Sequence, residues 1–382
     1  MSTDRPSDDS RYYDIAPEDA VQRFVQSKSR CVNSTKRSYR NQLTWFAEWC
    51  EAEGIESMKH LDGYLLNEYK EWRRTEGNAI EETLSPSTLK GDMKTLRDFL
   101  EWCWRREYVG NGLHLKVEIP RLDSPKERSE NRLTASESIP ISNYLEKFEH
   151  AELRHAVWAL LMSFGGRPTG LVALDVKDFE RDGLRGILRL RNRPDEGTRL
   201  KNGNDSERNI TISPYWCEVL EDWLAEKRPD MTDDHGREPL LATSRGRISP
   251  TTIRRYTNQL TRPCVTQSGC PHGRSTDDCE ALTKDTAQQC PSSKPPKAVR
   301  SGYISFYLKR GVPVWAVAER CDVSRRVLRR HYDLRSEEER RKQRTEEFFG
   351  KPSGHQSRDG GELSGRERDE WFVGSDHESY GR

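Results

Sequence analysis

A tyrosine lies inside a run of arginines near the carboxyl end of this 382-residue chain. In the stretch RRVLRRHYDLRSEEER (325–340), Tyr332 directly follows His331. A phenol is mostly protonated at neutral pH and is then a weak nucleophile, but surrounding cations favour the phenolate. The stretch therefore indicates either a buried structural tyrosine or a nucleophile that is held beside a polyanion.

Three other segments carry cations that a cleft could bring together. Arg167 follows a Gly-Gly pair in SFGGRPTGLVALDVKDFE (163–180), and Lys201 begins a loop rich in Gly, Asn and Asp between two expected strands. Lys297 and Arg300 are three residues apart near the start of an expected helix, so they share one face of it. Taken singly, each cation is more simply explained as a solvated surface side chain.

The region from Lys294 to Tyr332 combines positive charge with apolar residues at helical spacing. It holds ten Lys or Arg residues against two acids, Glu319 and Asp322. A solvated charge run is the usual explanation of such a stretch, but residues 299–306 include enough apolar side chains to fill a core and leave the cations on one side. The whole chain has a net charge of only +1, so the argument for a polyanionic partner must rest on such a local cleft.

The order of these segments resembles the tyrosine recombinases, also called phage-integrase-type or Xer-like site-specific DNA recombinases. The likeness spans about residues 18–345, and the segments around 290–308 and 321–339 are most similar to archaeal members. The resemblance implies that Tyr332 is the nucleophile and that Arg167 and Arg300 clamp the scissile phosphate. It also implies that Lys201 protonates the leaving 5′-oxygen. Strands are then rejoined through a 3′-phosphotyrosine without a metal or other cofactor in catalysis.

The sequence departs from the family pattern at three positions. Lys297 stands where most members have a histidine, and lysine is a poor proton acceptor. Gly170 stands where an acid usually orients the first arginine, and Asp322 falls near the position of a later histidine or tryptophan. A catalytically impaired DNA-binding relative of the same fold therefore stays open as the alternative to an active recombinase, and a zinc-dependent nuclease or an RNA-binding protein is a third hypothesis.

The expected fold is mainly α-helical with a small antiparallel β-sheet. Helices expected over 35–53, 60–74 and 85–108, with a shorter one near 17–28, form a helical core DNA-binding domain over 18–115. A linker over 116–134 leads to an α+β catalytic domain over 135–349, and the ends 1–17 and 350–382 are expected to be disordered. By the resemblance, the first domain clamps the duplex, and its candidates for DNA contacts are Lys36, Arg37, Arg40, Lys90 and Lys94.

Four cysteines gather in an insertion over 264–290, just before the Arg300 helix. Cys264, Cys270, Cys279 and Cys290, with His272 in reserve, offer the ligands of a tetrahedral structural zinc site. Their spacing is not that of a C-x2-C knuckle, so free thiols or one disulfide explain them equally well.

The expected partners and location follow from the resemblance and the composition. The partner is double-stranded DNA, bound by a homo-oligomer that is a tetramer on two duplexes. No apolar run reaches the length of a membrane span, and the chain starts without a signal-peptide core. A soluble, cytoplasmic protein without membrane contact is expected.

Overall fold

The computed structural model describes residues 12–29, 31–75, 83–121, 131–266, 269–275, 278–333 and 335–349. The chain divides into two compact units, Met1–Ser124 and Pro125–Arg382. The boundary falls inside the segment 116–134 that the sequence suggests as a linker. No helix of the described residues has the length and apolar character needed to cross a bilayer.

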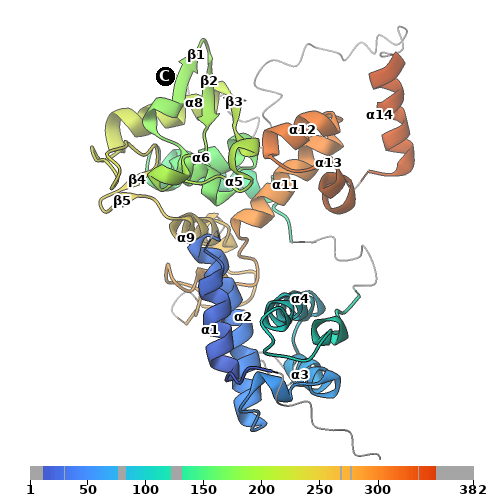
Figure 1. Ribbon diagram of the computed structural model, residues 1–382. Helices are drawn as coiled ribbons and strands as arrows, with labels where there is room; N and C mark the ends of the chain where they lie inside the picture. The colour runs from blue at the N-terminus through green and yellow to red at the C-terminus, as the bar shows by residue number, and fades with distance from the viewer. Residues whose placement is uncertain are drawn as a thin grey trace, which may run out of the picture. The chain divides into compact units, whose positions relative to one another are not determined.

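The described residues of unit 1 form four α-helices and two short 3-10 turns (Figure 1). The helices are α1 (Pro17–Ser27), α2 (Asn33–Ala52), α3 (Gly63–Thr75) and α4 (Pro86–Trp104), and the turns are Met58–His60 and Leu113–Lys116. Helix α4 begins as its sequence predicts, because the Ser85 side chain accepts a hydrogen bond from the Thr88 N–H and Pro86 is the first helical residue. Phe24, Phe46 and Phe99 meet in an aromatic core.

Residues 12–16, just before α1, contact the rest of unit 1, although disorder was expected through residue 17. The Tyr13 N–H donates to the Glu107 carbonyl at 2.9 Å, and the Ile15 carbonyl accepts from the Met58 N–H at 2.9 Å. Ile15 is buried in the core of unit 1. One apolar side chain thus anchors an otherwise polar stretch. The remaining predicted ends, 1–11 and 350–382, lie outside the described residues.

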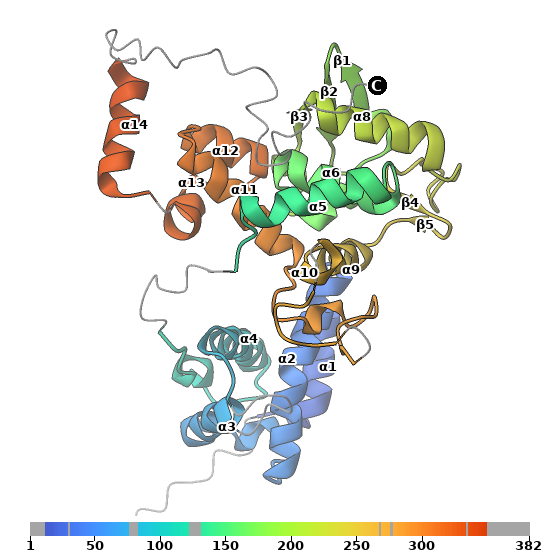
Figure 2. The same ribbon diagram turned by 180° about the vertical axis from the view of Figure 1, so that it is seen from behind.

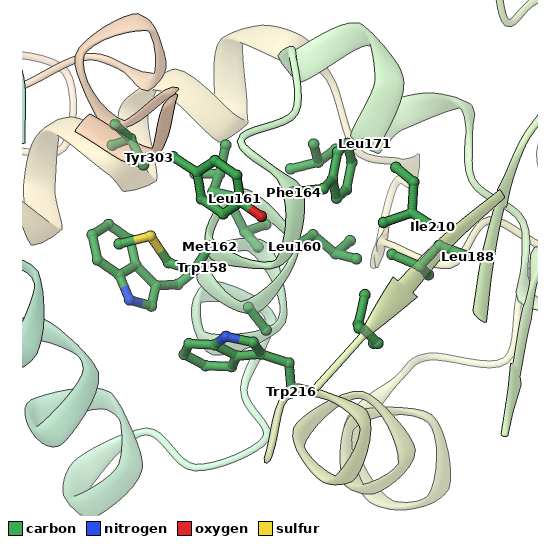
Figure 3. Packing of buried hydrophobic residues seen from close by; sticks show 14 of the residues in the cluster. Trp158, Leu160, Leu161, Met162, Phe164, Leu171, Leu188, Ile210, Trp216 and Tyr303 are labelled. Atoms are coloured by element: carbon green, nitrogen blue, oxygen red, sulfur yellow. The ribbon is translucent and has the colours of Figure 1, made fainter. Parts of the chain in front are cut away.

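Unit 2 begins with two helices, the second of which is buried. Helix α6 (Leu153–Phe164) follows α5 (Ala135–Phe148), and all but its first two residues are buried. Figure 3 shows Trp158, Leu161 and Phe164 of α6 at the centre of the core, with Tyr303 and Trp216 packed around them. A helix that is apolar all round needs cover on every side, and the sheet and later helices supply it.

The sheet of unit 2 has three antiparallel strands in the order β1-β2-β3. They are β1 (Phe179–Asp182), β2 (Arg185–Leu190) and β3 (Arg208–Ile212), and β2 pairs Leu188 with Ile210 of β3. The two strands expected on either side of the Lys201 loop are β2 and β3. Strand β1 was not expected, because it is short, largely exposed and lacks an apolar alternation. Residues 191–207 connect β2 to β3 as the predicted hairpin loop.

The remaining elements carry the tyrosine end of unit 2. They are α7 (Pro168–Ala173), α8 (Pro214–Asp222), β4 (Ala242–Thr243), β5 (Gly246–Arg247), α9 (Pro250–Leu260), α10 (Pro263–Thr266), α11 (Pro296–Lys309), α12 (Val314–Cys321), α13 (Arg325–Val327) and α14 (Glu337–Phe349). A π-helical turn, Leu328–Tyr332, continues α13. Figures 1 and 2 both show α11, α12 and α13 side by side. The fold is the expected one: mainly helical, with a small antiparallel sheet.

Candidate active site

The Gly-Gly turn after α6 sets the position of Arg167. Gly165 ends the helix in the left-handed conformation, with φ +58°, and a Cβ there would lie 2.8 Å from Cδ1 of Tyr303. Only glycine fits both conditions. Arg167 then caps the N-terminus of α7, and its side chain is 31% exposed. The turn thus places a guanidinium at the edge of the unit 2 core.

The other end of α7 is held by a buried ion-pair network. Arg247 Nη1 donates to the carbonyls of Val172 and Leu174, at 2.8 and 3.1 Å. Arg247 and Arg237 both pair with the Asp175 carboxylate. Burial raises the pKa of Asp175, but hydrogen bonds from the two arginines outweigh it and lower the pKa overall. Helix α7 is therefore fixed at both ends.

Arg300 lies on α11 and meets the Gly-Gly turn from the opposite side. Its Nη1 donates to the Gly165 carbonyl at 2.7 Å, and its Nη2 donates to the Asp322 carbonyl at 3.3 Å. The residue is only 6% exposed. Burial lowers the pKa of the Arg300 guanidinium, and Arg167 acts in the same direction. Two cations from segments more than 130 residues apart therefore share one small region.

Asp322 connects the arginines to the hairpin loop. It caps α12 in the left-handed conformation, with φ +51°. Its Oδ2 accepts from Arg167 Nη1 at 2.5 Å and from Ser206 Oγ at 2.8 Å, and its Oδ1 accepts from Asn202 Nδ2 at 3.1 Å. The carboxylate thereby fixes both the first arginine and the loop that carries Lys201, the residue before Asn202.

The structure leaves little room for a side chain at Gly170. A Cβ at Gly170 would lie 3.2 Å from Cδ2 of the buried Leu190, so a longer side chain meets the core of unit 2. The partner of Arg167 comes instead from Asp322, 155 residues further along the chain. Two departures that the sequence shows separately are thus linked in space.

A third guanidinium, Arg208, was missed by the sequence analysis. It begins β3, and its Nε and Nη1 donate to the carbonyls of Arg320 and Ser206 at 3.1 and 2.7 Å. Burial lowers the pKa of Arg208 to about 10, and the neighbouring Arg300 and Arg167 act in the same direction. The alternation along β3 could have shown that Arg208 points inward, because it shares a face of the strand with the buried Ile210 and Ile212.

Tyr332 ends the π-helical turn and is half-buried against the core of unit 2. Its carbonyl accepts a hydrogen bond from Ser305 Oγ of α11 at 3.3 Å. The tyrosine lies near enough to Arg300 to favour the charged form of that guanidinium, against the larger effect of burial. The phenol is therefore at the border of the arginine cluster and is not enclosed in the core.

Two further predicted site residues lie at the surface. Lys201 is exposed in the hairpin loop, next to Asn202, and Lys297 is exposed one turn before Arg300 on α11. No described residue forms an ion pair with either lysine. Both side chains are therefore free to reach a ligand beside the arginines.

The predicted DNA-contact cations of unit 1 lie on two helices that pack together. Thr95 Oγ1 of α4 donates to Gln42 Oε1 of α2 at 2.9 Å. None of these cations is buried, and within the described residues none forms an ion pair. They are Lys36, Arg37 and Arg40 on α2, and Lys90 and Lys94 on α4. Their positions leave five charges available at the surface of unit 1.

A separate group of side chains, outside the arginine cluster, carries ligand atoms of the kind that bind metal ions. Ligand atoms of Glu146, His150 and His155, on and between α5 and α6, lie within 4.8 Å of one another. His150 already bonds to Asp222 Oδ2 at 2.9 Å and pairs with Glu146. His155 is fully buried, and burial lowers its pKa to about 4. The exposed member of the group is thus engaged in ion pairs.

Comparisons with known proteins agree with this architecture. The family model of the phage integrase N-terminal SAM-like domain matches residues 22–107. A DNA-bound lambda integrase dimer (residues 75–356) has the same fold, with a TM-score of 0.56 and 15% identity over 85% of this chain and 97% of that one. XerH recombinase bound to its difH substrate gives 0.55 and 13%, over 84% and 82%.

The N-terminal domain of a phage integrase/site-specific recombinase from Haloarcula marismortui is 33% identical over 28% of this chain and 99% of that one, with a TM-score of 0.26. No curated protein matches the sequence. The N-terminal domain match and the shared two-domain fold define the class as an integrase-type protein. Residues 22–107 thus belong to the phage integrase SAM-like domain family, and the chain has the fold of the tyrosine recombinases.

Proposed function

We propose that the protein is a site-specific DNA recombinase that cleaves and rejoins duplex DNA through Tyr332. The observation that carries the proposal is the convergence of Arg167, Arg208 and Arg300, of which Arg300 also interacts with Tyr332. Three guanidiniums stand around a single carboxylate, Asp322. Such a surplus of desolvated positive charge suits an anion with several oxygens, and guanidiniums match a phosphodiester bidentately.

The proposed reaction conserves the number of phosphodiester bonds. The Tyr332 phenol loses its proton to solvent and its oxygen attacks the scissile phosphorus. The bond from phosphorus to the 5′-oxygen breaks, and a 3′-phosphotyrosine forms. Lys201 donates a proton to the departing 5′-oxygen, and Arg167 and Arg300 bind the non-bridging oxygens. A 5′-hydroxyl from the partner strand then attacks the phosphotyrosine and releases Tyr332. Donors that are fixed in advance lower such a barrier by about 3–4 kcal/mol each.

In this scheme Asp322 is a positioning residue. It makes no contact with the reacting atoms, but it orients Arg167 and holds the hairpin loop that bears Lys201. The acid that Gly170 lacks is thus supplied by α12. Lys297, at the start of the Arg300 helix, takes the position of the family histidine and donates a hydrogen bond to the phosphate.

Duplex DNA and self-assembly are the proposed partners. Lambda integrase is known as a dimer on a core site and as a tetramer on a Holliday junction, and the same assemblies are proposed here. The cations of α2 and α4 in unit 1 would contact the phosphate backbone, so affinity should fall with rising salt.

The deciding experiment uses a nicked suicide duplex that traps the covalent intermediate. The wild-type protein should form a DNA adduct that survives denaturation, and Tyr332→Phe should form none while it still shifts the duplex. The neighbouring His331→Phe is the matched control, because this exposed residue has no role in the scheme. If the wild-type protein binds the duplex but forms no adduct, the protein is instead a catalytically impaired DNA-binding relative. The observation in favour of this alternative is the Asp322 carboxylate, which lies inside the arginine cluster.

A further inference from the structure

The four cysteines of the insertion line a single small cavity. Cys264 lies in α10, and Cys270, Cys279 and Cys290 follow on separate turns, yet all four border the same space of about 10 Å³. That volume holds about one water-sized sphere. The cavity therefore suits a single ion and is too small for an organic ligand.

Three of these cysteines begin tight backbone turns. The carbonyls of Cys270, Cys279 and Cys290 each accept a hydrogen bond from the N–H three residues later, at 3.1, 3.2 and 2.9 Å. Each of these three cysteines therefore lies at the first position of a short turn beside the same cavity.

The insertion has too few apolar side chains to fix itself. Among its described residues, the buried apolar ones are Ala281, Ala287 and Cys290, and Leu282 is 41% exposed. Ordering a backbone costs roughly 1–2 kcal/mol per residue, and burial of two alanines offsets little of that. All four cysteines are free thiols, so no disulfide closes the segment. A further cross-link is therefore needed to hold these turns.

We propose that Cys264, Cys270, Cys279 and Cys290 bind one structural zinc ion. Four thiolates complete a tetrahedral shell without an open position, which is typical of structural and not catalytic zinc. His272 is left out of the shell, because its Nε2 is hydrogen-bonded to Ser292 Oγ at 3.0 Å.

Zinc binding requires the cysteine sulfurs to lie closer together than they do in this structure. Zn–S bonds of about 2.3 Å place the sulfurs about 3.8 Å apart. Among the described residues, the group of three metal-type ligands whose ligand atoms all lie within 4.8 Å of one another is Glu146, His150 and His155. The cysteine sulfurs do not meet this looser limit. The cysteine side chains would therefore turn inward around the ion. This proposal does not depend on strand transfer by Tyr332.

The test measures metal in the full-length protein. Protein that is washed with chelator, reloaded with Zn²⁺ and desalted is analysed by mass spectrometry of the metal. We expect about one zinc per chain, a loss of at least about tenfold in Cys270→Ser and Cys279→Ser, and retention in Cys31→Ser. Cys31 is the matched control, since this free, half-exposed thiol lies in unit 1.

A second measurement, on the wild-type protein, tests the proposal even if the cysteine variants fail to fold. Wild-type protein loaded with Co²⁺ should show thiolate-to-cobalt charge-transfer absorption, which Zn²⁺ should abolish. Less than about a tenth of an equivalent of zinc in the wild type would overturn the proposal. Full zinc content in a folded Cys270→Ser protein would do the same. A titration that finds fewer than nine thiols in denatured, unreduced protein would show a disulfide instead.

Discussion

Replacement of Asp322 by asparagine tests whether this carboxylate positions the site or competes with the phosphate. The substitution removes the charge but keeps the shape, and asparagine tolerates the left-handed backbone that Asp322 adopts at φ +51°. If Asp322 orients Arg167, cleavage should slow while DNA binding stays equal or tightens, because the pocket loses a negative charge.

The expected size follows from the contacts of the carboxylate. Asp322 accepts hydrogen bonds from Arg167, Ser206 and Asn202 at 2.5, 2.8 and 3.1 Å. A hydrogen bond between charged groups contributes about 1 kcal/mol more than a neutral one. The Arg167 side chain is 31% exposed, so solvent weakens the pair. A loss of about 1 kcal/mol in the transition state slows cleavage roughly fivefold.

The assay compares single-turnover adduct formation on the suicide duplex with binding of the same duplex in a Tyr332→Phe background. Glu319→Gln is the matched control, because it makes the same charge change at an exposed position of the same helix. Thermal unfolding checks that Asp322→Asn is folded. Faster cleavage in Asp322→Asn than in the wild type would refute the positioning role and show that the carboxylate blocks the phosphate site.

Three further predictions concern other residues of unit 2. Arg208→Gln should slow adduct formation by tenfold or more, about 1.4 kcal/mol or greater; an unchanged rate in folded protein would show that Arg208 only ties backbone carbonyls. Gly165→Ala should lower the free energy of unfolding by about 2–4 kcal/mol through left-handed strain and overlap with Tyr303, whereas Gly183→Ala, at φ +59° with open space around it, should show the strain alone. An equal loss of unfolding free energy in Gly165→Ala and Gly183→Ala would contradict an overlap with Tyr303. The pKa of His155 is about 4 in the folded protein against 6.5 for the ordinary group, so the unfolded state binds more protons between these values and stability falls as the pH drops from 6.5 to 4. Urea unfolding should show this decline, up to about 3 kcal/mol, and His155→Gln should flatten it; an equal slope in both proteins would mean that other groups cause it.

Local patterns were enough to predict most elements of the fold. The stripe of Leu89, Met93, Leu96 and Leu100 predicted α4, and all four side chains are buried. Residues 207–213, ERNITIS, alternate between polar and apolar side chains as a strand does, and they contain β3. By contrast, β1 could not be seen, because a four-residue strand at the edge of a sheet gains its stability from pairing with β2 and not from its own composition.

The sequence by itself determined the order of the site segments: an arginine after a Gly-Gly turn, a hairpin lysine, a basic helix start and a late tyrosine. Only the tertiary structure decided that Asp322 pairs with Arg167 and that Arg208 joins the cluster. Hydrogen bonds and ion pairs act over a few ångströms in space, whatever the separation along the chain. The 155 residues between Arg167 and Asp322 therefore leave no local pattern from which their pairing could be read.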